Sequence, residues 1–171
     1  MSAFLATLKQ DCVRNRVSAK SLFIVIAFRM SSAIAQHPVA AVRLFGLPVR
    51  LMYRICVELL LCIELPDRVK AGPGLAVFHG AGLVVNAATR LGANVTLRQC
   101  TTIGAKGADE AAPEIGDNVS VGANVVILGP ITVGAGSRIG AGAVLVESCP
   151  PGCVVYAAKA RISPATLAGS G

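Results

Sequence analysis

The chain has 171 residues, enough for one domain with a hydrophobic core or for a small domain with an appendage. Apolar residues make up 54% but aromatic residues only 4%, and 18 residues are glycine, which favours a regular, tightly coiled backbone over a core filled with large rings. Most of the formal charge of +7 lies in residues 1–70. The basic residues there do not cluster and do not alternate with aromatic residues that could stack on bases, so we expect no nucleic-acid binding.

Cysteine spacing and hydropathy limit what else the chain could be. The six cysteines form no CxxC pair and the two histidines, His37 and His79, lie far apart, so we predict no metal site. The N-terminus lacks an apolar core followed by a cleavage site, which favours a cytoplasmic protein with reduced thiols. Three charges interrupt the most apolar stretch, residues 51–65, so we predict no spanning helix and at most a peripheral contact with the inner membrane.

The first 65 residues are predicted to be helical. Residues 18–36 carry apolar side chains at helical spacing, with Ser18 or Ser21 as the N-cap. A second helix is predicted over residues 48–63. A proline closely follows each of these segments and should end it.

A strict period of six replaces the helical pattern from residue 79 onward. Helices repeat every 3.6 residues and strands every two, so a period of six indicates a short strand followed by a tight turn. Glycine follows directly in six of ten hexads, and Asn94, Asn118 and Asn124 could supply further turns with positive φ. The ten aliphatic positions are Val85, Leu91, Leu97, Ile103, Ile115, Val121, Ile127, Val133, Ile139 and Leu145.

Three such hexads would close one triangular coil, whose aliphatic side chains stack inward on those of the next coil. The period therefore predicts a three-sided parallel β-helix of roughly four to five coils, although it does not fix the hand. Residues 104–114 break the period. Their Gly, Ala and acidic residues predict a loop leaving one corner, either a tolerated insertion or a functional segment.

The ordered hexads resemble a known family, the hexapeptide-repeat acyltransferases. Within it the sequence is most similar to serine acetyltransferases and to colanic-acid-type exopolysaccharide acetyltransferases, over about residues 50–162. The strings that carry the resemblance are FHGAGLVVN (78–86), TIGAKG (102–107), VGANVVILGPITVGAGSRIGAGAVL (121–145) and AKARI (158–162).

This resemblance implies a fold, a cosubstrate and an assembly. The fold would be mainly β, a left-handed parallel β-helix (66–162) with an α-helical N-terminal region (1–65) and a C-terminal tail (163–171). The cosubstrate would be acetyl-CoA. The assembly would be a homotrimer, which the N-terminal helices could stack into a hexamer.

Acetyl transfer to an alcohol needs a general base at neutral pH, and histidine suits that role. His79 falls on the six-residue period, where the other residues are aliphatic, and on spacing alone it could equally be structural. The resemblance matches it to the family's catalytic histidine. A catalytic histidine usually has an acidic partner. The matching position is Glu64, with Asp67 as the alternative, and either acid could instead be a solvated loop charge.

The resemblance also implies positions that bind acetyl-CoA. Backbone N–H groups at the TIGAKG turn could stabilise the oxyanion, and small turn residues could lie along the pantetheine arm between neighbouring subunits. Two cations near the C-terminus could meet the CoA phosphates. All of these could also be ordinary turn or surface residues. The candidates are Gly104, Ala105, Ala123, Ala141, Lys159 and Arg161.

The acceptor is predicted from a departure within the loop. Serine acetyltransferases carry a histidine before a proline there, and it contacts the amino acid, whereas this chain has Ala112. We therefore predict O-acetylation of a sugar hydroxyl in exopolysaccharide biosynthesis, on a free or lipid-linked glycan contacted by Asn86, Arg98 and Asp109. Serine O-acetylation is the alternative, and a non-catalytic β-helical scaffold is a third hypothesis.

Overall fold

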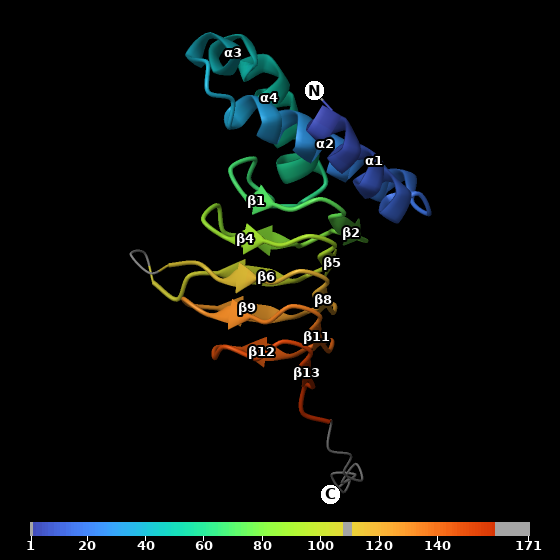
Figure 1. Cartoon of the computed structure of the whole chain (residues 1–171), viewed down its shortest axis with the longest axis vertical. Helices are drawn as coiled ribbons and strands as arrows, with labels where there is room; N and C mark the ends of the chain where they lie inside the picture. The colour runs from blue at the N-terminus through green and yellow to red at the C-terminus, as the bar shows by residue number, and fades with distance from the viewer. Residues whose placement is uncertain (1, 108–110, 160–171) are drawn as a thin grey trace, which may run out of the picture.

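The structure is a computed structural model that describes residues 2–107 and 111–159, so the predicted tail (163–171) lies outside it. A helical N-terminal region lies at one end, and the coils of a parallel β-helix follow one after another beneath it (Figure 1). Strands β1 and β2 lie next to the helices, while β12 and β13 lie at the far end (Figure 1). The first coil is therefore the one that joins the two regions.

The helix predicted over residues 18–36 is α2 (Ala19–Ala35). Its N-cap is Ser18, whose hydroxyl accepts a hydrogen bond from the backbone N–H of Ser21 at 3.2 Å, which decides between the two serines. Helix α1 (Ser2–Asn15) packs alongside it. None of the helices in the described ranges is both long and apolar enough to cross a bilayer.

The helix predicted over residues 48–63 begins where predicted but ends at Leu60, and its second half is not α-helical. A short helix, α3 (Ala40–Phe45), comes first, and Gly46 separates it from α4 (Leu47–Tyr53). A Cβ on Gly46 would collide with the side chain of Ile34, so glycine permits this close turn. The chain then continues as a π-helix, η1 (Arg54–Leu60), and Ile63 already belongs to the buried core.

The described strands form three parallel sheets, one on each face of a prism. The sheets are called A (β3, β6, β9, β12), B (β1, β4, β7, β10) and C (β2, β5, β8, β11, β13). The strands are β1 (Lys70–Ala71), β2 (Ala76–Phe78), β3 (Val84–Val85), β4 (Arg90–Leu91), β5 (Thr96–Arg98), β6 (Thr102–Gly104), β7 (Glu114–Ile115), β8 (Ser120–Val121), β9 (Val126–Leu128), β10 (Thr132–Val133), β11 (Arg138–Ile139), β12 (Val144–Leu145) and β13 (Val154–Val155).

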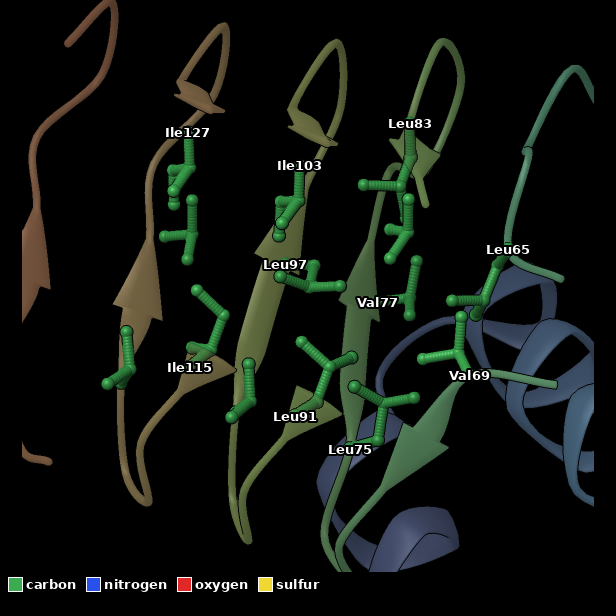
Figure 2. Close-up of a cluster of buried hydrophobic side chains, with 14 of the residues drawn as sticks. Leu65, Val69, Leu75, Val77, Leu83, Leu91, Leu97, Ile103, Ile115 and Ile127 are labelled. Carbon is green, nitrogen blue, oxygen red and sulfur yellow. The ribbon is translucent and has the colours of Figure 1, made fainter. Parts of the chain in front are cut away.

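The six-residue period is confirmed by the core. Nine of the ten aliphatic positions are buried, and Leu145, in the last coil, is half-buried. In sheet A, Ile103 pairs with Val85 on one side and Ile127 on the other, so identical positions stack in a column (Figure 2). Full burial of a Leu, Ile or Val side chain contributes about 1.5–3 kcal/mol. Each buried position of the column therefore stabilises the prism.

Asparagines make the left-handed turns that the sequence predicts. Asn94, Asn118 and Asn124 have φ of 57°, 57° and 56°. Asparagine tolerates this region better than other residues with a side chain. The Asn94 amide also donates to the Asn118 amide oxygen of the next coil at 3.1 Å, so the turns stack as regularly as the strands.

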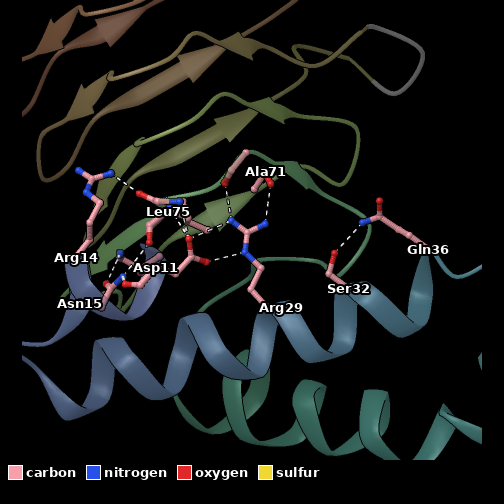
Figure 3. Close-up of polar contacts among 11 residues, drawn as sticks. Asp11, Arg14, Asn15, Arg29, Ser32, Gln36, Ala71 and Leu75 are labelled. Atoms are coloured by element: carbon pink, nitrogen blue, oxygen red, sulfur yellow. Dashed lines mark hydrogen bonds and ion pairs between the residues drawn. The ribbon is translucent and has the colours of Figure 1, made fainter. Parts of the chain in front are cut away.

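A buried ion pair fastens the helices to the first coil (Figure 3). Arg29 of α2 donates from Nε to Asp11 of α1 at 2.6 Å and from Nη1 to the Ala71 carbonyl at 2.7 Å. Asp11 in turn accepts the backbone N–H groups of Gly74 and Leu75, at 2.7 and 3.0 Å. Each charge therefore has a counter-charge and further hydrogen bonds, as buried charges require.

Candidate active site

His79 lies at the corner between sheets C and A, directly after β2. The first coil is longer than the next at this corner, because Val77 pairs with Leu97, 20 residues on, whereas Val85 pairs with Ile103, 18 residues on. Two extra residues therefore lie between Val77 and Val85. The placement of His79 on the six-residue period is wrong, since Val77 takes the buried position.

The insertion turns His79 outward. Its φ is 62°, in the left-handed region that residues with a side chain seldom adopt, and its side chain is exposed. Gly80 follows with a φ of 26°, and a Cβ there would lie 2.7 Å from Cδ1 of Ile63. Glycine thus lets this bulge close on the core. The imidazole is left on the outer surface, where a substrate can reach it.

Glu64 lies at the edge of sheet A, where it forms an isolated parallel bridge with Val84. Its side chain is exposed, and within the described residues no hydrogen bond joins it to the His79 imidazole. The preceding residue, Ile63, is the one against which Gly80 packs. Glu64 therefore flanks the corner that bears His79, and a direct pairing of the two stays a prediction.

The alternative acid, Asp67, is occupied elsewhere. Its buried carboxylate accepts hydrogen bonds from Arg50 at 2.7 Å and from Ser31 at 2.9 Å. Burial alone would raise the pKa of Asp67, but the hydrogen bonds from Arg50 and Ser31 outweigh it and lower the pKa. Asp67 is thus a structural anion that ties α2 and α4 to the first coil.

A second carboxyl group, Glu58, was missed by the sequence analysis. It lies on η1 and lines, together with Glu64, Arg54 and two apolar residues, a cavity of about 340 Å³. Burial raises the pKa of Glu58, although Arg54 opposes the shift. No sequence signal would have found this residue, because the π-helix sets its direction and hydrophobic periodicity does not report a π-helix.

The candidate acceptor residues fall at two edges of sheet A. Arg98 ends β5, in register with the residue before His79, and makes two long hydrogen bonds of 3.4 and 3.5 Å to the next coil. Asn86 follows β3 at the opposite edge, where its side-chain oxygen accepts a backbone N–H at 2.9 Å. The structure therefore brings Arg98, but not Asn86, to the His79 corner. Asp109 lies outside the described residues.

The candidate pantetheine residues are also divided within one chain. Ala123 and Ala141 stack at the corner between sheets C and A, where the Ala123 carbonyl accepts the N–H of the residue after Ala141 at 2.9 Å. Ala105 follows β6 at the opposite edge of sheet A. Ala105 therefore does not share a corner with Ala123 and Ala141 within this chain.

The remaining candidates are placed as follows. Gly104 ends β6, next to the loop that carries Ala105, and its carbonyl accepts a backbone hydrogen bond at 3.0 Å. Lys159 is exposed at the end of the described chain, and Arg161 lies beyond it. No cluster of three metal-ligating side chains occurs in residues 2–107 and 111–159.

Comparisons with known proteins point to one family. The profile "Bacterial transferase hexapeptide (six repeats)" matches residues 112–146. WcaB of Escherichia coli (strain K12), provisionally named a colanic acid biosynthesis acetyltransferase, is 33% identical over 156 residues, 90% of this chain and 96% of its own. A Helicobacter pylori (strain J99) serine acetyltransferase is 39% identical over 101 residues, 58% of this chain and 59% of its own. Serine acetyltransferase isoform 3 of Entamoeba histolytica, solved with cysteine, has a TM-score of 0.78 at 20% identity, over 96% of this chain and 62% of that one.

The hexapeptide profile match and the acetyltransferase relatives together show that this protein is an acyltransferase. The chain belongs to the hexapeptide-repeat acyltransferases. The predicted fold, a left-handed parallel β-helix with a helical N-terminal region, is confirmed by the likeness to the Entamoeba structure. The relatives also imply acetyl-CoA as the cosubstrate. The chain spans 59% of the Helicobacter serine acetyltransferase and 62% of the Entamoeba one, so their acceptor does not transfer with the fold.

Proposed function

We propose that this protein transfers the acetyl group of acetyl-CoA to a sugar hydroxyl in exopolysaccharide biosynthesis. One observation carries the proposal: the similarity to WcaB extends over 90% of this chain and 96% of that protein, whereas the similarity to the Helicobacter serine acetyltransferase extends over 58% of this chain and 59% of that protein. In addition, Ala112 stands before Pro113, where serine acetyltransferases have the histidine that meets the amino acid. An alanine offers no side-chain hydrogen bond to a small zwitterion.

His79 acts as the general base in this proposal. Its imidazole takes the proton of the acceptor hydroxyl while the oxygen attacks the thioester carbon. When the tetrahedral intermediate collapses, the C–S bond breaks and the CoA sulfur leaves with the proton that His79 held. The outward position at a rigid corner supports this role, because the imidazole is accessible and its backbone is fixed between paired strands.

Glu64 assists His79 by stabilising the imidazolium. The engagement of Asp67 with Arg50 and Ser31 favours Glu64 over the alternative acid. Backbone N–H groups at Gly104 and Ala105 stabilise the oxyanion, where fixed dipoles act at low reorganisation cost.

The site is shared between subunits of a homotrimer. Support comes from the position of Ala105 at the opposite edge of sheet A from Ala123 and Ala141, because a neighbouring chain could bring such separated positions to one pantetheine arm. Lys159 and Arg161 meet the CoA phosphates. Residues 66–162 form the transfer unit, and residues 1–65 attach it to a neighbouring trimer or to the cytoplasmic surface of the inner membrane.

The glycan lies against the His79 corner, where Arg98 is available, and extends across sheet A to Asn86 at the opposite edge and to Asp109. Such scattered contacts suit a large acceptor, because a sugar on a carrier offers many hydroxyls for hydrogen bonding. A lipid-linked glycan satisfies this requirement as well as a soluble one.

Serine O-acetylation is the second candidate. The observation that favours it is the higher identity, 39%, to the Helicobacter serine acetyltransferase over the residues that align. The two functions differ in the acceptor and not in the cosubstrate.

Steady-state kinetics with acetyl-CoA, a panel of exopolysaccharide repeat-unit sugars and L-serine would test the proposal. We expect saturable acetylation of a glycan and poor use of L-serine. A site built to hydrogen-bond one acceptor rejects an acceptor that lacks the matching group by about 10⁴–10⁵-fold. Efficient acetylation of L-serine with no activity on any sugar would establish the second candidate instead.

A further inference from the structure

Helices α3 and α4 present an apolar surface that no other part of residues 2–107 and 111–159 covers. No residue of α3 is buried, and Phe45 is 83% exposed. We call this surface the α3–α4 face. It lies at the end of the molecule opposite β12 and β13 (Figure 1). Its side chains are Val42, Leu44, Phe45, Leu47, Leu51 and Met52.

Arginines surround the α3–α4 face. Arg43, Arg50 and Arg68 line a cavity of about 560 Å³ whose remaining walls are apolar and include Leu44. A second cavity, of about 460 Å³, lies beside it and is lined by Arg50, Arg54 and the apolar side chains of α4. Guanidinium groups therefore stand at the border of exposed hydrocarbon, an arrangement typical of helices that lie in a membrane interface.

The segment that carries this face has charge of one sign, and the nearest acids are Asp67, which pairs with Arg50, and Glu58 and Glu64, which line a cavity with Arg54. Between Asp11 and Glu58 the sequence has seven Arg and Lys residues and no Asp or Glu. A second copy docked face to face would set one arginine-bordered surface against another, because a two-fold interface pairs the same patch of both copies. An anionic lipid surface instead offers phosphates to the arginines and hydrocarbon to the apolar side chains.

We infer that the α3–α4 face docks this protein on an anionic lipid bilayer. The apolar side chains enter the boundary between headgroups and acyl chains, and Arg43, Arg54 and Arg68 contact lipid phosphates. Because α2 packs on β2, the coil that bears His79 lies directly behind the docked helices. The reaction proposed above would then occur close to the membrane, a consequence that rests on the proposed function, whereas the docking itself does not.

Co-sedimentation with vesicles tests the docking. The wild type should bind vesicles of phosphatidylcholine with roughly one third phosphatidylglycerol, should bind pure phosphatidylcholine much more weakly, and should lose binding at high salt. Replacing Leu44 and Phe45 together by serine should lower the partition coefficient by about ten- to a hundredfold. Arg43→Gln should lower it by roughly fivefold.

Matched controls lie at the other end of the molecule. Tyr156→Ser removes a side chain that is 80% exposed, and Arg138→Gln removes one exposed charge, so both should bind vesicles as the wild type does. Circular dichroism should show that every variant is folded, since the replaced side chains are exposed. Acetylation of a soluble acceptor should be unchanged by the Leu44 and Phe45 replacements, which separates failure of docking from failure of the proposed function.

Three results would overturn the inference. The first is no binding of the wild type to anionic vesicles, and the second is equal loss of binding in the control variants. The third is a fall in oligomer mass by light scattering when Leu44 and Phe45 are replaced, with unchanged vesicle binding. That last result would identify a second copy as the occupant of the α3–α4 face.

Discussion

Replacing Asp11 by asparagine should loosen the helical region from the β-helix. The Asp11 carboxylate is fully buried and meets Arg29 at 2.6 Å, while its other oxygen accepts two backbone N–H groups (Figure 3). Asparagine keeps one acceptor oxygen but leaves the buried guanidinium of Arg29 without a counter-charge. Removing one partner of a buried ion pair destabilises a protein by about 3–5 kcal/mol.

Asp117 offers a matched control for this substitution. Its side chain is exposed, its Oδ1 accepts the backbone N–H of Ala93 at 2.7 Å, and no arginine in the described ranges forms an ion pair with it. Asp117→Asn should therefore cost about 1 kcal/mol or less. Urea unfolding followed by circular dichroism, at one protein concentration, would compare the two free energies of unfolding. A cost for Asp11→Asn within about 0.5 kcal/mol of that for Asp117→Asn would refute the reasoning.

The other predictions concern the core, the acid stability and the acidic partner of the base. Ile103→Ala removes a fully buried side chain from the column of sheet A and should lower the free energy of unfolding by about 2–5 kcal/mol, whereas Val144→Ala, 65% exposed in the same sheet, should lower it by less than about 1 kcal/mol. Because the pKa of Asp67 lies below its ordinary value of 3.8, its pairing with Arg50 stabilises the fold above that pH and the stabilisation is lost as the pH falls through the lowered pKa. Asp67→Asn should accordingly flatten the acid limb of stability against pH in urea unfolding, and an unchanged limb would count against the pairing. Glu64→Gln should lower turnover by less than His79→Ala does, and an equal or larger loss would assign Glu64 a role of its own in the chemistry.

The prism could be predicted because each hexad repeats the same local physics. Val85, Leu91 and Leu97 recur at one spacing, and a side chain that recurs every six residues can be buried only by stacking on its neighbours. The turns could also be predicted from the sequence, because Asn94 and Asn118 tolerate the positive φ that the corners require. The hand of the coil was not contained in the period and came from the family resemblance.

Departures from the repeat were harder to predict. The extra two residues at His79 were hidden because His79 lies six residues before Val85 and so seems to continue the period. Only the pairing of Val77 with Leu97 shows that the register has shifted. The π-helix over residues 54–60 escaped for a similar reason, because apolar spacing near 3.6 residues does not distinguish an α-helix from a wider one.

The sequence predicted which residues could form the candidate site but not how they are arranged in space. The sequence pointed to His79 and Glu64, and the structure places both at one corner without joining them. It could not show that Ala105 and Ala123 lie at opposite edges of sheet A, since that depends on where the coil turns. Glu58 could not be predicted as a site residue, because its burial depends on how η1 packs.

Turnover of His79→Ala tests the central claim most directly. The claim is that an outward histidine on the first coil removes the proton of the acceptor hydroxyl during acetyl transfer. With saturating acetyl-CoA and acceptor, His79→Ala should keep its fold and bind CoA but lose turnover by about 10²–10⁴-fold, while His37→Ala, which removes the other histidine, should remain near the wild type. Near wild-type turnover in a folded His79→Ala protein would contradict the account.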